Sequence, residues 1–402
     1  MLTVEEALKE VLSRTRVLEA ESVDVTEALG RYLAEPVISR REIPPWPNSS
    51  MDGYALRAGD TRGGGARLHV VAHIAAGVLP SRPIGSGEAA RIFTGAPLPD
   101  GADAVVPQED VEVDGDHVRV PADIARHAFV RPRGEDVRPG DRVLDPGQRL
   151  GPAEIGLLAT LGHSPVRVHR RPRVAILSTG NELADLGDEP GPGQIPNSNS
   201  YSLMAQTLEA GAIPVNLGIA RDELPAIEHR VQSARQADVL LSSAGVSVGE
   251  FDLVREALRR SGAELHLWQV SMRPGKPITF GSLGRTLVFG LPGNPVSAMV
   301  TFELFVRPAL LRLSGSARLQ RPRFAARVRT RIANPGHRRG YLRVKLHRRG
   351  AGLEAELTGD QGSGILRSMA LADGLAVIAP DTTMEPGDAV EVIVLRALEL
   401  LD

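Results

Sequence analysis

Hydrophobic and polar positions follow two different rhythms along the chain. Between residues 171 and 315, short runs of consecutive apolar residues alternate with longer stretches in which apolar residues recur every three or four positions. The short runs predict buried strands, and the longer stretches predict amphipathic helices. Strands are expected near residues 174–178, 213–218, 238–243, 264–270 and 286–290, and helices near 200–210, 223–235, 252–261 and 295–313. A strand that leads into a loop and then a helix, several times over, is typical of a parallel α/β sheet.

The segments before this region mix helical and strand-like patterns. Thr3 opens a capping-box sequence and predicts an N-terminal helix. Further helices are expected near residues 27–33 and 152–161, the second with proline in its first turn. Between residues 55 and 143, short alternating runs are separated by turn residues. That stretch predicts a separate small β domain inserted into the helical N-terminal domain.

No long helical pattern recurs after Ser314. Short alternating runs lie between Gly, Pro and Asp turns, which indicates a small barrel or sandwich, and a barrel is the form expected. The expected domains are an N-terminal domain (1–54 and 143–170), an inserted β domain (55–142), a parallel α/β domain (171–315) and a C-terminal β-barrel domain (320–402).

Composition narrows the class of protein. The net charge of −2 provides no global basic field, so nucleic acid is not an expected partner. There is no cysteine, which excludes disulfides and thiolate metal sites. The N-terminus is acidic and amphipathic, unlike a signal peptide, and no apolar run reaches the roughly 18 residues of a membrane span. A cytoplasmic protein without a membrane partner is therefore expected.

Candidate chemistry gathers in loops that follow three of the expected strands. These loops contain residues 178–183, 242–249 and 290–295, and all are rich in glycine, serine or both. Small residues before a helix leave backbone N–H groups free to bind anions. Ser242, Ser243, Gly245 and Ser247 are the candidate anion contacts of the middle loop. Glu182 and Asp252 lie in the same loops, so a phosphate-bearing ligand with a hard cation such as Mg²⁺ is expected.

The middle loop permits a second interpretation. Gly245-Val-Ser-Val-Gly249 matches the nucleophile elbow of serine hydrolases. Such an enzyme also needs a downstream acid and a histidine, for which His266, His337 and His347 are the candidates. Ser247 is explained more simply as an anion contact or a helix cap.

Lys276 is a candidate of another kind. Lysine and arginine number 47 together, and only Lys9, Lys276 and Lys345 are lysines. Lys276 lies between a glycine and a proline, beside the expected anion site, whereas arginine is accepted nearby at Arg273. An ammonium and a guanidinium differ in shape and hydration, so we expect Lys276 to act in catalysis.

Taken together, the loops resemble the molybdopterin molybdenumtransferase family, which includes MoeA and the gephyrin E domain. The resemblance covers almost the whole chain. It rests on residues 44–55, 94–96, 133–136, 178–183, 242–249, 274–277, 290–295 and 361–363. It implies a MogA/MoaB-like core, a homodimer and a Mg²⁺-dependent reaction. In that reaction molybdate enters the dithiolene of adenylylated molybdopterin, supplied by an upstream adenylyltransferase, and AMP is released.

The resemblance also implies roles for individual residues. The family's functional positions fall on Asp52, Thr94, Asp136, Glu182, Asp222, Asp252, Pro292, Pro295, Arg343 and Ser363. Glu182, Asp222 and Asp252 belong to the cation and phosphate end, and Arg343 and Ser363 to molybdate. Asp52, Thr94 and Asp136 are expected from the partner subunit. Arg273 and Asn294, in the matching loops, complete the candidate substrate contacts.

This sequence departs from the family pattern at several positions. Gln269 and Arg273 stand where lysines are expected, and Gly340 stands where an acid is expected. Asn181 replaces the usual Asp before Glu182, and residues 243–245 replace Ser-Gly-Gly. A scaffold protein on the same fold, without catalysis, is the remaining alternative.

Overall fold

The computed structural model describes residues 1–243, 253–350 and 352–396, and candidate residues Gly245, Ser247 and Asp252 lie outside them. The chain forms two compact units. One comprises residues 1–35, 146–155 and 164–402, and the other comprises residues 36–145 and 156–163.

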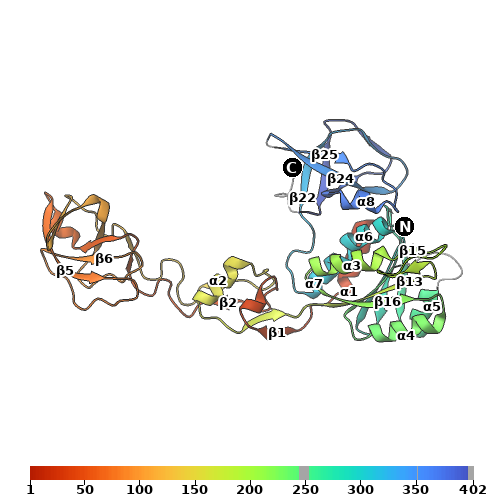
Figure 1. Ribbon diagram of the computed structural model, residues 1–402, viewed down its shortest axis with the longest axis horizontal. Helices are drawn as coiled ribbons and strands as arrows, with labels where there is room; N and C mark the ends of the chain where they lie inside the picture. The colour runs from red at the N-terminus through yellow and green to blue at the C-terminus, as the bar shows by residue number, and fades with distance from the viewer. Residues whose placement is uncertain (244–252, 351, 397–402) are drawn as a thin grey trace. The chain divides into compact units, whose positions relative to one another are not determined.

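A six-stranded sheet forms the centre of the first unit (Figure 1). Its order is β16 (Ile213–Ala220), β13 (Arg173–Thr179), β17 (Val239–Ser243), β21 (Thr286–Leu291), β20 (Pro277–Leu283) and β18 (Glu264–Gln269). The first four strands are mutually parallel, as expected from their apolar runs. Residues 277–283, for which the apolar pattern predicts no strand, form β20 antiparallel to both neighbours.

Helices cover both faces of this sheet. On one face α4 (Leu224–Ala234) and α5 (Leu253–Arg260) pack against apolar residues of the parallel strands. On the other face lie α1 (Val4–Arg14), α3 (Ser198–Glu209), α6 (Pro295–Thr301), the π-helical segment η4 (Phe302–Val306) and α7 (Arg307–Leu313). The expected helix 295–313 therefore exists, with a π-helical turn in its middle. Short strands β14 (Leu183–Ala184) and β15 (Ile195–Pro196) pair beside the core.

The N-terminal segment of this unit has less helix than expected. The Thr3–Glu6 capping box forms and starts α1, and β1 (Ala20–Val23) pairs with β12 (Val166–His169). The prediction of a helix at residues 27–33 is wrong, because only a 3₁₀ turn, η1 (Thr26–Ala28), forms there. Gly30 has φ of +76°, which no helix accommodates, and Leu33 instead bridges Val168. The helix expected at 152–161 forms as α2 (Pro152–Thr160), whose residues are divided between the two units.

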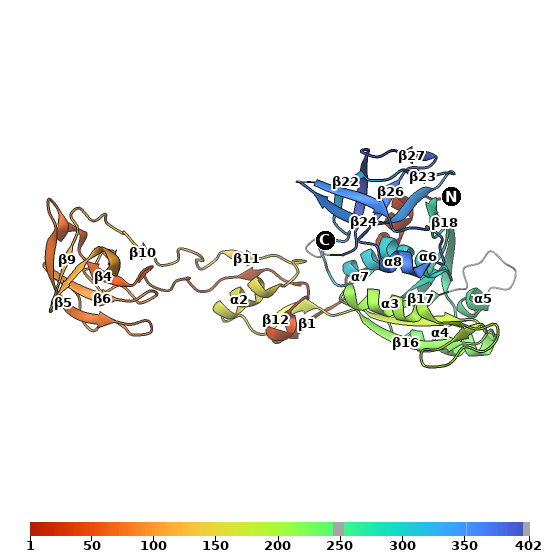
Figure 2. The same cartoon turned by 45° about the horizontal axis from the view of Figure 1, so that its top comes forward.

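The C-terminal residues form a closed barrel, as expected. The ring of strands is β24 (Arg339–Arg349), β25 (Gly352–Leu357), β22 (Arg323–Val328), β28 (Ala389–Val394) and β26 (Gly374–Ile378), which returns to β24. Alternate apolar residues fill its interior. Strands β23 (Ile332–Asn334) and β27 (Thr382–Met384) pair beside it, and α8 (Leu366–Ala370) lies next to α6 (Figure 2).

The second unit is built on a sheet of order β7 (Ala104–Pro107), β4 (Gly53–Leu56), β6 (Glu88–Ile92), β5 (Ala66–Ile74), β9 (His117–Val120) and β8 (Glu112–Asp114). Apolar clusters cover both of its faces. The small pairs β2 (Val37–Ile38) with β11 (Arg142–Leu144) and β3 (Asn48–Ser49) with β10 (Val130–Arg131), and the 3₁₀ turns η2 (Ala58–Thr61) and η3 (Gln108–Asp110), complete it.

Candidate active site at the carboxyl edge of the core sheet

The carboxyl ends of four parallel strands meet at one edge of the core sheet. Because each loop starts where its strand ends, that edge carries several of the candidate side chains. They are Glu182 after β13, Asp222 after β16, Ser242 and Ser243 at the end of β17, and Pro292, Asn294 and Pro295 after β21. Ligands of open α/β sheets bind at such an edge.

A buried network of hydroxyl groups holds the ends of β13 and β17 to the start of α3. The Ser178 hydroxyl lies 3.1 Å from that of Ser243 and 2.8 Å from that of Ser200, and it donates to Asn197 Oδ1 at 3.1 Å. Asn197 also caps α3 by accepting a bond from the Ser200 N–H. Ser243 therefore serves the scaffold, whereas the buried Ser242 hydroxyl has no partner among the described residues.

The loop after β13 is tied to the loop after β16. The Asn181 N–H donates to Asp222 Oδ2, and the Asp222 N–H donates to Asn181 Oδ1, each at 3.2 Å. Asn181 therefore links the two loops, through its backbone N–H and its Oδ1 atom. The exposed Glu182 carboxylate folds back over Gly180, where a Cβ would lie 2.3 Å from Oε2. Gly180 also has φ of +144°, so this loop requires glycine on both grounds.

The loop that carries Arg273 and Lys276 is held from two sides. On one side the Leu2 N–H donates to Gln269 O at 2.9 Å, and the Ser271 N–H donates to Leu2 O at 2.8 Å. On the other side β19 (Met272–Arg273) pairs with β24 of the barrel. Arg273 is exposed and Lys276 is half-buried. Gly275, with φ of +98°, packs so closely on Thr301 that a Cβ would lie 2.6 Å from Oγ1.

Ser363 of the barrel meets the core loop directly. The Asn294 side-chain amide donates to Ser363 Oγ at 3.0 Å, and the Val296 N–H donates to Ser363 O at 3.1 Å. Asn199, which sequence reasoning missed, donates to Gly293 O at 2.7 Å and supports the same loop. The sequence feature that could have indicated Asn199 is its position in the first turn of α3, shortly after a glycine-rich loop.

Arg343, expected from the resemblance to bind molybdate, lies behind the loop that carries Ser363. The residue is completely buried, and its guanidinium donates to Ser368 Oγ at 3.0 Å, Gly362 O at 3.0 Å and Asp360 O at 3.3 Å. Burial lowers its pKa to about 10, so the group is still charged at neutral pH. One nitrogen, Nη1, is buried and has no hydrogen-bond partner within the described part of the chain. Arg343 therefore orders the loop that presents Ser363.

The second unit brings Asp52 and Thr94 together. Asp52 Oδ1 accepts bonds from the Thr94 N–H and from the Thr94 hydroxyl, both at 2.8 Å. The bond from the backbone N–H, followed by that from the hydroxyl, lowers the pKa of the Asp52 carboxyl. Asp136 is exposed, and its N–H donates to Ile43 O at 2.9 Å. Exposed apolar side chains, Met51 and Phe93, flank the first two residues in sequence.

The positions of the three candidate histidines do not support the interpretation as a serine hydrolase. The His337 side chain is 98% exposed and pairs with Asp381 at 3.4 Å, and His347 pairs with Glu356 at 3.2 Å. Both pairs belong to the barrel. His266 lies within β18, and its buried Nε2 has no partner among the described residues.

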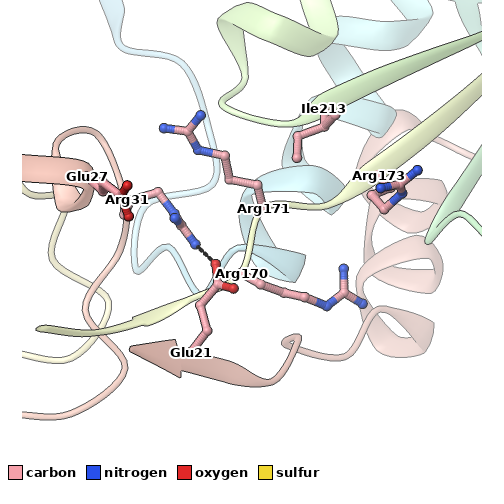
Figure 3. Close-up of a pocket in the computed structure, with 7 residues that line it drawn as sticks. All are labelled: Glu21, Glu27, Arg31, Arg170, Arg171, Arg173 and Ile213. Atoms are coloured by element: carbon pink, nitrogen blue, oxygen red, sulfur yellow. Dashed lines mark hydrogen bonds and ion pairs between the residues drawn. The ribbon is translucent and has the colours of Figure 1, made fainter. Parts of the chain in front are cut away.

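A cavity of about 500 Å³ lies elsewhere in the first unit, lined at the amino ends of β13 and β16 (Figure 3). It contains none of the candidate residues. Arg31 on its wall bonds Glu21, and Arg170 makes a two-pronged pair with Asp238 at 2.6 and 2.7 Å. Arg170 also bonds Glu19, so it joins the N-terminal segment to the core, and we assign the cavity a structural role.

Comparison with known protein families matches three consecutive regions. Residues 2–162 match the MoeA N-terminal region (domains I and II), residues 175–312 match a probable molybdopterin binding domain, and residues 325–395 match the MoeA C-terminal region (domain IV). Among the residues described, no helix is long and apolar enough to cross a membrane.

Individual relatives cover nearly the whole chain. A molybdopterin molybdenumtransferase of Nostoc sp. is 40% identical over 90% of this chain and 85% of its own. Molybdopterin molybdenumtransferase 2 of Mycobacterium tuberculosis is 37% identical over all of both chains. Among solved structures, a molybdopterin biosynthesis MoeA protein of Pyrococcus horikoshii has a TM-score of 0.84 at 28% identity and covers 98% of this chain and 100% of its own.

Proposed function

Because this chain belongs to the molybdopterin molybdenumtransferase family and is an enzyme of molybdenum cofactor biosynthesis, we propose that it transfers molybdate to adenylylated molybdopterin and releases AMP. The observation that carries the proposal is the hydrogen bond from Asn294 to Ser363. This bond joins a loop at the edge of the core sheet to the barrel loop of Ser363. The core loops, proposed to bind the phosphate ester, and the barrel loop, proposed to bind molybdate, therefore line the same site. Hydroxyl and N–H donors suit both ligands.

The proposed reaction changes no oxidation state. Each of the two dithiolene sulfurs forms a bond to molybdenum as one Mo–O bond breaks. Each of the two departing oxygens takes up two protons and leaves as water. The P–O–P bond of the adenylylated substrate is cleaved by one water, so AMP leaves with its own phosphate. The sulfurs belong to the substrate, which agrees with a chain that has no cysteine.

The residues present fit a hard cation at the phosphate end. Glu182 and Asp222 offer carboxylate oxygens from neighbouring loops of the same edge, which is the ligand chemistry of Mg²⁺. In the described part of the chain no group of three or more acidic, histidine or cysteine side chains forms a metal site. Asp252, the third proposed ligand, lies outside that part. When bound, Mg²⁺ would neutralise phosphate charge at this edge.

A homodimer is part of the proposal. Asp52, Thr94 and Asp136 lie in the second unit, and we propose that they close the site of the partner subunit. The paired Asp52 and Thr94 carry ordered polar groups, and the flanking Met51 and Phe93 are apolar and exposed, as subunit contacts require. Mixing inactive Asp52→Asn protein with inactive Glu182→Gln protein should restore activity through hybrid dimers. An active monomer in solution would exclude this arrangement.

The direct test is a single-turnover reaction. The protein is incubated with adenylylated molybdopterin, the product of the proposed upstream adenylyltransferase, with and without molybdate and Mg²⁺, and AMP is measured. AMP release that needs both is the expected result, and parallel reactions with tungstate determine the choice of oxyanion. A protein that binds the substrate but releases no AMP would be a scaffold. The cytoplasmic location stays a prediction, tested by fractionation.

A further inference from the structure

The linker between the core and the barrel contains one guanidinium that contacts both. Arg321 follows α7, which ends at Leu313, and precedes β22, which begins at Arg323. Its Nε donates to Glu303 Oε2 at 2.9 Å and its Nη2 to Glu209 Oε1 at 2.8 Å, and both acids belong to the core. Its Nη1 donates to Leu395 O at 3.1 Å, at the end of the barrel.

These bonds lie in a shielded place. The Arg321 side chain is 12% exposed and that of Glu303 is 3% exposed. Glu303 belongs to the π-helical segment η4, one turn after Met299, and it accepts a further bond from Gln206 Nε2 at 2.9 Å. Water competes weakly at such a position, so the geometry of the pair is well defined.

Segments on both sides of this junction between core and barrel are continuous in sequence with the proposed site. The helix that contains Glu303 begins at Pro295, directly after Asn294. Across the junction, α8 begins directly after the loop that carries Ser363. A cavity of about 370 Å³ lies between these segments and is lined by Met299, Glu303, Arg321 and Met369, among others. The junction is therefore hollowed beside Arg321, whereas apolar side chains of the barrel, among them Tyr341 and Leu375, pack against the core elsewhere.

We propose that Arg321 is a positioning residue that holds the barrel in register with the core, so that Ser363 reaches Asn294. This inference rests on the proposed function for its catalytic consequence only. The barrel would contribute Ser363 and the Arg343-ordered loop to the oxyanion end, whereas the phosphate end belongs to core loops. Loss of Arg321 should therefore weaken the use of molybdate and leave the binding of adenylylated molybdopterin nearly unchanged.

The absence of cysteine makes a direct distance measurement possible. Leu208 on α3 and Thr383 on β27 are exposed and are replaced by cysteine for spin labelling. In the full-length protein, pulsed electron resonance should give a narrow distance distribution between the two labels. Arg321→Ala should broaden or shift that distribution and should raise the KM for molybdate at least about tenfold, while the KM for adenylylated molybdopterin changes by less than about threefold.

Arg323→Ala is the matched control because it removes the same charge. Arg323 pairs with Glu391 at 2.8 Å, and both residues belong to strands of the barrel. It should leave both measurements unchanged. Arg321→Lys, which keeps one charged contact, should restore part of the KM. If Arg321→Ala does not fold, Arg321→Gln keeps a polar side chain beside Glu303, which retains Gln206 and Arg307 as partners, and it should show the same effects.

An unchanged distance distribution in a folded Arg321 variant overturns the proposal, as does a broadened one with an unchanged KM for molybdate. If the wild-type protein releases no AMP at all, the proposed function has failed. The distance measurement then still decides whether Arg321 fixes the barrel.

Discussion

The side-chain amide of Asn294 donates to the hydroxyl of Ser363 across 3.0 Å, and this contact joins the α/β core to the barrel at the proposed site. The two residues are far apart in sequence, and each comes from a loop ordered by other groups. Asn294 precedes the helix that begins at Pro295, and the loop of Ser363 is held by Arg343. A substrate that spans both loops would therefore meet donors that are already in place, which lowers the entropic cost of binding.

Ser363→Ala removes one hydroxyl from this contact. A neutral hydrogen bond at an exposed position stabilises the fold by at most about 1 kcal/mol, so the melting temperature should change little. The KM for molybdate should rise about tenfold, equivalent to about 1.4 kcal/mol. Ser316→Ala, which removes another exposed serine hydroxyl of a loop, is the control and should have no effect on KM. An unaltered KM in Ser363→Ala would remove Ser363 from the site.

Lys276→Arg keeps the charge and changes its shape. Lys276 follows Gly275, whose Cα packs against Thr301, so the space around this loop is small. A planar guanidinium should fit poorly, and kcat/KM for AMP release should fall at least about tenfold, or about 1.4 kcal/mol. The exposed Arg273 has more room, and Arg273→Lys should be nearly neutral. Wild-type turnover by Lys276→Arg would show that this lysine has no special role.

Glu182→Gln separates chemistry from folding. The carboxylate is exposed and folds over Gly180, so the isosteric amide should keep the loop and leave the melting temperature nearly unchanged. If Glu182 is the Mg²⁺ ligand proposed above, its loss should abolish most of the Mg²⁺-dependent AMP release. The measurements are calorimetry and a Mg²⁺ titration of activity. A variant that unfolds, yet has normal activity per folded molecule, would assign Glu182 to structure.

The pair of Asp52 and Thr94 predicts a pH effect. Bonds from the Thr94 N–H and hydroxyl favour the ionised carboxylate, so the pKa of Asp52 is lowered. A lowered acid pKa contributes stability that is complete above the usual range of an aspartate and is lost as the pH falls through the folded-state pKa. Thr94→Ala keeps the N–H and should raise the pKa of Asp52 only part of the way back. A carbon-detected NMR titration measures the change, and an identical titration curve in the variant would refute the hydroxyl contribution.

Arg343→Lys tests a buried cation. The guanidinium binds Ser368 and two backbone carbonyls with no exposure to solvent, and an ammonium cannot reproduce that fork. The free energy of unfolding should fall by about 2–4 kcal/mol, since buried polar groups lose their partners. Lys345→Arg, two residues along β24 and exposed, should change it by less than about 0.5 kcal/mol. Urea titrations of both variants provide the comparison.

Local patterns in the sequence predicted most of the fold. Apolar runs located the parallel strands, and the capping box located α1. Strand β20 was missed because its first residue is a proline, although a signal existed. Leu283 pairs with Thr286 across a two-residue turn whose first residue, Gly284, has φ of +63°. Such glycine-containing turns are typical of hairpins, so this turn indicates two antiparallel strands over residues 277–291.

Contacts between distant segments were beyond reach of these patterns. Alternation along β24 places Arg343 on the outer face of the barrel, and nothing nearby in sequence shows that residues 360–368 cover it. Likewise, a helical period over residues 295–313 cannot reveal the π-helical turn that holds Glu303, because one inserted residue barely alters the pattern. Both features depend on where other segments pack.

The loop of Arg273 and Lys276 lies between Leu2 and β24, and this has a consequence for synthesis on the ribosome. One of its flanking segments is made first, and the other emerges only after the entire core has been translated. A nascent chain that has completed the core sheet still lacks the strand that fixes this loop. Lys276 can therefore be held in place only late in translation, so a truncated chain that ends before β24 should fold its sheet and be inactive.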